Sequence, residues 1–179
     1  MLAPKTLSLD LTLEFEIKKM LVDFKTLPDN ARIWIYQASR SFNETELEEI
    51  RSEMNTFVND WTAHGSDLKA SYEIRYKRFI ILGLDQSQTA ASGCSIDASV
   101  HFMLHLEKKY GVELLDKMNV SYKQGEYVAY KSLSDFKKMA RQKAVSKNTI
   151  VFNNLVANKQ EYEEHWEVPA AESWHARFM

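Results

Sequence analysis

One short run limits the fold of this chain more than any other: Phe79-Ile80-Ile81-Leu82-Gly83-Leu84, which carries no polar side chain. A strand without a polar face must be covered on both sides, so the run predicts the central strand of a sheet. Residues 68–76, just before it, alternate apolar and polar side chains, as in a strand with one buried face. Tyr76-Lys77-Arg78 lies between the two segments and predicts a tight hairpin.

A helix is predicted before this hairpin. Asn43 and Glu46 have the spacing of a capping box, in which each side chain bonds the other residue's backbone N–H. Apolar residues then recur at helical spacing from Leu47 to Trp61. We expect the helix to end near His64-Gly65, with Gly65 in the left-handed conformation that often follows a helix.

A second helix is predicted after the hairpin, capped by Ser95 or Asp97 and ending near Tyr110-Gly111. With a strand at residues 32–37, the order becomes strand, helix, strand, strand, helix. This order indicates an α+β fold, a ferredoxin-like split β-α-β sandwich over about residues 28–117. We also expect strands 32–37 and 79–84 to run parallel, which would place His64 at the far end of the sheet from Cys94.

Residues 118–179 predict a smaller module. It consists of a hairpin turning at Gly125, a helix capped by Ser132 with Asp135 at the third position, and a strand at residues 149–152. An acidic and then aromatic tail follows, containing Trp166, Trp174, His175 and Phe178. Such a tail either docks on its own domain or provides a homodimer surface.

Residues 1–27 are expected to be an N-terminal extension. Residues 7–17 alternate with period two, which indicates either an extra strand or an upstream segment, with translation starting at Met20.

Composition excludes several classes of function. The chain has 179 residues and a net charge of −2, and its Lys and Arg are spread along the sequence, so nucleic acid is not an expected partner. One cysteine rules out an internal disulfide and favours the cytoplasm. No apolar run is long enough to predict a membrane span.

Cys94 lies in the small-residue segment Ser92–Asp97, expected to be a loop at a helix N-terminus, where anions bind and thiol pKa values fall. Two interpretations stay open: a nucleophile with His64 as its base, or a buried structural thiol. The residue six positions after Cys94 is Val100, so the phosphatase pattern C-x5-R is absent. The candidate ligand-binding residues are Asp85, Ser92, Gly93, Ser95, Asp97 and His64.

His101 and His105 share a helix face, as two metal ligands would, but an exposed structural pair is the simpler interpretation. No metal and no cofactor is predicted.

Five strings carry a resemblance to a known family. They are Trp34-Ile35-Tyr36-Gln37, Trp61-Thr62-Ala63-His64-Gly65, Ser92-Gly93-Cys94-Ser95-Ile96-Asp97, Val151-Phe152-Asn153-Asn154-Leu155-Val156 and Ser173-Trp174-His175. Together they resemble small bacterial proteins that often carry the label ABC transporter ATPase, over about residues 20–178. The family supplies no catalytic residues to carry over. Residues 120–152 also resemble small GYF-type modules, which bind peptides or protein partners.

The ABC transporter ATPase label conflicts with the positions of the glycines in this sequence. An ABC ATPase needs G-x4-G-K-[ST] to hold phosphates and Mg²⁺, and none of the five glycines is followed by Lys. We therefore expect a non-catalytic protein that binds a small molecule or a protein partner. A Cys94-dependent enzyme and the labelled ATPase are the alternatives.

Without a phosphate-binding loop, millimolar ATP with Mg²⁺ should leave the melting temperature unchanged, because only a ligand of the folded state raises it. A saturable rise in a thermal-shift titration would instead support the ATPase label.

Overall fold

The computed structural model describes residues 21–179; the alternating segment 7–17 and the start at Met20 lie outside the described residues. Its elements, in chain order, are η1 (Phe24–Thr26), β1 (Arg32–Gln37), α1 (Glu44–Asp60), β2 (Thr62–Ala63), β3 (Ser66–Asp67), β4 (Lys69–Arg75), β5 (Phe79–Asp85), α2 (Gly93–Tyr110), β6 (Val120–Gln124), β7 (Tyr127–Lys131), α3 (Leu133–Arg141), β8 (Ile150–Phe152), α4 (Lys159–His165), β9 (Glu167–Pro169), η2 (Ala170–Glu172) and η3 (Trp174–Phe178). The chain is a mixed α and β protein, as expected.

The first sheet has the order β1-β5-β4, with β5 in the centre and antiparallel to both neighbours. The prediction that strands 32–37 and 79–84 run parallel is therefore wrong; it is β1 and β4 that share a direction. The result is a split β-α-β unit, in which α1 connects the parallel strands β1 and β4 and β5 lies between them. Within the described residues no fourth strand joins this sheet, because the chain after α2 enters a second sheet.

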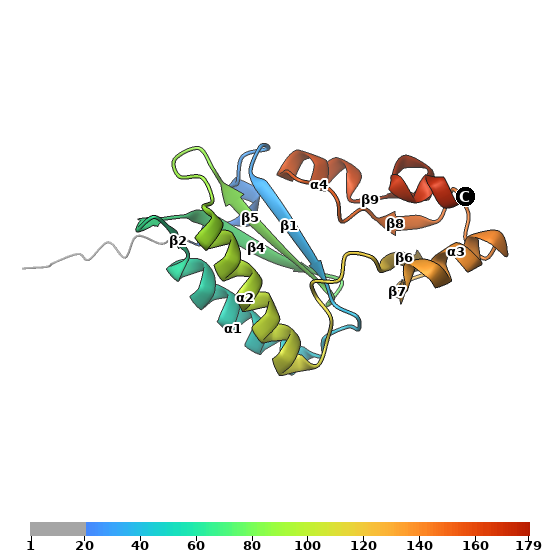
Figure 1. Ribbon diagram of the computed structural model, residues 1–179, viewed down its shortest axis with the longest axis horizontal. Helices are drawn as coiled ribbons and strands as arrows, with labels where there is room; N and C mark the ends of the chain where they lie inside the picture. Colours follow the sequence, from blue (N-terminus) through green and yellow to red (C-terminus); the bar gives the residue numbers. More distant parts are fainter. Residues whose placement is uncertain (1–20) are drawn as a thin grey trace, which may run out of the picture.

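The central strand β5 is buried along its whole length, which confirms the prediction from its apolar run. Successive side chains of a strand point to opposite faces. Ile80, Leu82 and Leu84 therefore pack with the residues of α1 and α2, whereas Phe79 and Ile81 pack on the other face. Figure 1 shows the two long helices together on one side of the sheet and α4 on the other.

Gly83 is the one position of β5 where a side chain has no room. A Cβ added there would lie 2.5 Å from Cδ1 of Leu27 and 3.1 Å from Cε2 of Phe24. Both of these residues belong to the segment around η1, which covers this face of the sheet next to Ile33. The glycine thus lets the chain before β1 pack directly against the central strand.

We predict that Gly83→Ala destabilises the protein by about 2 kcal/mol, because extra atoms in a packed core force neighbours out of place. Thermal unfolding should then start several degrees lower. Gly93→Ala is the matched control: it adds the same methyl group where nothing lies within 4 Å, and its midpoint should not fall. Equal midpoints for the two variants would contradict this account of Gly83.

The second sheet has the order β7-β6-β8-β9, and it shares a core with the first. The hairpin at Gly125, the cap at Ser132 and the strand β8 were all expected, whereas α4 and β9 were not. Phe152, Tyr162 and Trp166 pack in one cluster with Phe79 of the central strand. The 28–117 and 118–179 segments are therefore joined by a continuous layer of aromatic side chains.

The aromatic tail packs against its own chain. His175 is fully buried between the rings of Trp174 and Phe136, with centroids 3.9 and 5.7 Å away. Its Nδ1 lies 2.7 Å from Oγ of Ser173. Burial, and secondarily the charge of Arg177, lowers the pKa of His175 to about 4.

His175 should make stability depend on pH. The unfolded chain takes up a proton near pH 6.5 and the folded chain only near pH 4, so stability is complete above the higher value and falls as the pH decreases between the two. The loss is at most about 3 kcal/mol. In urea titrations across this window, His175→Asn should show a flatter profile than the natural chain. Parallel profiles would mean that His175 does not titrate in this way.

Candidate functional site

The end of α1 differs from its prediction. The helix ends at Asp60, with Trp61 as an extended C-cap, instead of near His64-Gly65. The indole Nε1–H of Trp61 donates to the carbonyl oxygen of Ser95 at 2.8 Å. This bond connects the end of α1 to the first turn of α2. His64 and Gly65, with φ of 52° and 75°, then form the two-residue turn of the β2–β3 hairpin, which such angles favour.

The start of α2 also differs. Ser92 is the N-cap, rather than Ser95 or Asp97, and the helix begins at Gly93. Ser92 and Ser95 form a reciprocal box: the N–H of Ser95 donates to Oγ of Ser92 at 3.1 Å, and the N–H of Ser92 to Oγ of Ser95 at 2.8 Å. Most of the predicted Ser92–Asp97 loop is therefore helix, and its serines bond each other.

Three of the candidate residues have defined surroundings. Cys94 is exposed on the first turn of α2, so the interpretation as a buried structural thiol is wrong. Asp85 is buried, pairs with Nζ of Lys69 at 3.1 Å and accepts from the N–H of Ser87 at 2.9 Å. Burial alone would raise the pKa of Asp85, but these bonds outweigh it and lower the pKa. Asp97 is exposed on α2.

His64 and Cys94 lie at the same end of the sheet, contrary to the prediction. Because β5 is antiparallel to β1, α1 returns to the end from which α2 starts, and α2 contacts β2 of the hairpin. His64 is nevertheless exposed at the hairpin tip, and within residues 21–179 no hydrogen bond joins it to Cys94. Without such a bond the two residues have no oriented nucleophile–base contact.

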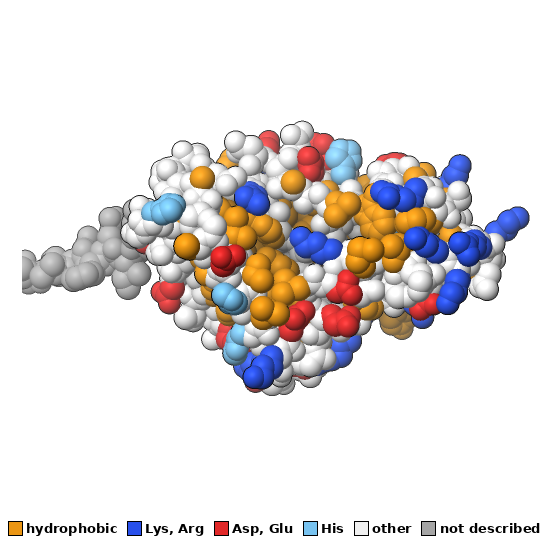
Figure 2. Space-filling model, viewed as in Figure 1, with side chains coloured by type: hydrophobic (Ala, Val, Ile, Leu, Met, Phe, Trp, Pro, Cys, Tyr) orange, Lys and Arg blue, Asp and Glu red, His pale blue; other side chains and the backbone are white. Residues whose placement is uncertain are grey.

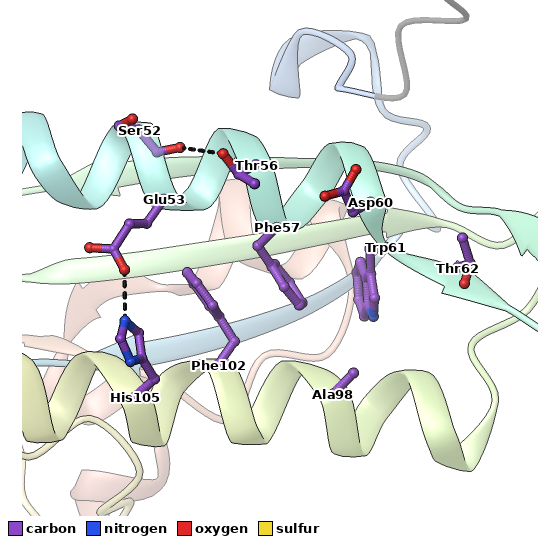
Figure 3. A pocket seen from close by; sticks show the side chains of 10 residues that line it. All are labelled: Ser52, Glu53, Thr56, Phe57, Asp60, Trp61, Thr62, Ala98, Phe102 and His105. Atoms are coloured by element: carbon purple, nitrogen blue, oxygen red, sulfur yellow. Dashed lines mark hydrogen bonds and ion pairs between the residues drawn. The ribbon is translucent and has the colours of Figure 1, made fainter.

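A groove between α1 and α2 has a volume of about 560 Å³. Its lining residues are Ser52, Glu53, Thr56, Phe57, Asp60, Trp61, Thr62, Ala98, Phe102 and His105. Figure 3 shows aromatic side chains in a row between the two helices. The rings of Phe57 and Phe102 stack with centroids 4.5 Å apart, and Trp61 lies 5.4 Å from Phe57.

One end of the groove carries paired charge. Glu53 bonds Nε2 of His105 and Nζ of Lys109, both at 2.8 Å, and accepts from the hydroxyl of Tyr110 at 3.1 Å. Burial works against its ionisation, but these three bonds prevail and lower the pKa of Glu53. The carboxylate is thus held charged by three neighbours.

The other end carries unpaired charge. Asp60 is exposed at the last position of α1, whose final turn contains no basic residue. A helix C-terminus is itself partially negative, so the carboxylate and the helix end repel each other. Within residues 21–179 no Lys, Arg or His forms an ion pair with Asp60. This end of the groove would therefore attract a cation.

The sequence pattern did not reveal this groove. Phe57 and Trp61, four positions apart, belong to the apolar residues of the predicted first helix, and Phe102 belongs to the predicted second helix. The sequence does show aromatic residues in both predicted helices. It does not show which face of each helix is left uncovered, because that depends on how the two helices pack. Among the described residues, no group of three possible metal ligands lies together.

Comparison of the chain with protein-family models, with curated proteins and with solved structures found no match. Within residues 21–179, every helix is too short or too polar to cross a membrane.

Proposed function

We propose that this protein is a non-catalytic binding protein whose site is the α1–α2 groove. The observation that carries the proposal is the groove itself, about 560 Å³ in volume with three aromatic side chains along it. Small-molecule sites commonly have volumes of about 300–1,000 Å³, an apolar lining and a few polar groups. The groove begins at Ala98, one residue beyond the Ser92–Asp97 segment that was expected to bind a ligand.

The charges of the groove favour one class of ligand, an organic cation with an aromatic or other apolar body. The apolar body would lie against Phe57 and Phe102, which are partly exposed, because burying apolar surface is the main source of affinity in such sites. The positive group would lie at Asp60, where it neutralises both the carboxylate and the helix end. Glu53, already bonded to three neighbours, offers less to a ligand.

A Cys94-dependent enzyme remains the second candidate, supported by the exposure of the thiol on the first turn of α2. Nucleophilic catalysis by a thiol also needs a positioned base. An exposed free thiol is also more compatible with a reducing compartment, which supports the cytoplasm as the place of action.

Tryptamine is a simple probe for the groove, and indole-3-propionate is its anionic counterpart. We predict that tryptamine binds with saturation in ligand-observed NMR and that the anion binds more weakly. Ala98→Trp, which fills the groove, should abolish binding. Asp60→Asn should weaken binding about fivefold, the size expected for one exposed charge pair.

Glu48→Gln is the control for Asp60→Asn, because Glu48 is an exposed carboxylate on the same helix that does not line the groove. It should leave the tryptamine affinity unchanged. The proposal fails if Ala98→Trp still binds tryptamine, or if the cation and the anion bind equally well.

A further inference from the structure

A second site lies on the opposite part of the molecule, where α3 meets η3. A hollow of about 300 Å³ is lined by Lys137, Arg141, Arg177 and Phe178. Lys137 and Arg141 are four residues apart on α3, and residues at this spacing lie on the same helix face. Figure 2 shows Lys and Arg side chains gathered around hydrophobic ones at the right-hand end of the molecule, the end that contains α3 and η3 in Figure 1.

The three cations of this hollow differ in their pairing from cations elsewhere in the described structure. Within residues 21–179 none of them forms an ion pair, whereas Lys69, Lys109 and other cations elsewhere pair with Asp or Glu. Arg177 is held in place by a bond from its Nε–H to the carbonyl oxygen of Trp174, at 3.1 Å. This concentration of positive charge stands out in a chain whose net charge is −2.

We propose that this basic hollow binds a short acidic segment of a partner protein, whose carboxylates would face Lys137, Arg141 and Arg177. Unpaired like charges repel one another, and an oppositely charged partner relieves that repulsion. Arginine is suited to this role because its planar group bonds a carboxylate through two parallel N–H donors. The site is separate from the α1–α2 groove and does not depend on what binds there.

The aromatic rings at the hollow favour a peptide over single-stranded nucleic acid. Proteins that bind single strands need free ring faces on which bases stack. Here Nζ of Lys137 lies 4.8 Å from the centre of the Phe178 ring, and the guanidinium of Arg177 lies 5.8 Å from it. The same guanidinium lies 5.8 Å from the Trp174 ring. Each of the two rings thus already has a cation near it, with which a stacked base would compete.

The test uses the full chain and fluorescein-labelled peptides, poly-glutamate and poly-glutamine, in fluorescence anisotropy at low salt. The natural chain should bind poly-glutamate and not poly-glutamine, and added salt should weaken binding. The triple variant Lys137→Gln, Arg141→Gln, Arg177→Gln should bind poly-glutamate about tenfold more weakly, as the loss of three charge pairs at the surface predicts. The control changes three exposed lysines outside the hollow, Lys25→Gln, Lys108→Gln and Lys117→Gln, with the same change in net charge.

The control variant should keep the affinity of the natural chain, which would show that the hollow and not the total charge binds the peptide. Equal losses in both triple variants would overturn the proposal, and so would tighter binding of oligothymidylate than of poly-glutamate. Circular dichroism of the triple variant should match that of the natural chain, since all three cations are replaced at the surface. Sedimentation should show monomers; a complex of two copies that the triple variant abolishes would make the occupant a second copy and would also overturn the proposal.

Discussion

The burial of β5 on both faces is the constraint on which the rest of this structure depends. The run Phe79–Leu84 carries no polar side chain and cannot lie at a solvated face, so other parts of the chain must cover each side of it. The helices α1 and α2 cover one side, and η1 with the aromatic residues of the second half covers the other. Neither half of the chain could leave this arrangement without exposing apolar surface of the central strand to water.

The same arrangement produces the candidate site. Because β5 is antiparallel to β1, α1 ends where α2 begins, and the bond from Trp61 to Ser95 joins the two helices at that end. Farther along, Phe57 and Phe102 stack across the gap instead of meeting backbone to backbone. The groove therefore lies between two helices that are joined at one end by the Trp61–Ser95 bond and that contact each other farther along through the rings of Phe57 and Phe102.

Local signals in the sequence predicted most of the elements. The Asn43–Glu46 box, the apolar run of β5 and the turn at Gly125 each act within a few residues, and each was confirmed. One error was local, since the box that caps α2 joins Ser92 and Ser95, three positions apart. Other errors involve contacts between distant parts of the chain. α1 ends at Asp60, before the predicted end, and the next residue, Trp61, bonds Ser95, a residue 34 positions away that no local pattern contains. The α1–α2 groove and the basic hollow were missed for the same reason, since each is lined by segments far apart in the chain.

The aromatic layer that joins the two sheets has a consequence for how the chain would behave if it were cut. Phe79 belongs to one side of that layer and Phe152, Tyr162 and Trp166 to the other. A protease that cleaved the connection between α2 and β6 would separate the backbone but not these rings. The two fragments would stay associated, each serving as the solvent-excluding surface of the other, and the nicked protein would keep the mass of the intact one in solution.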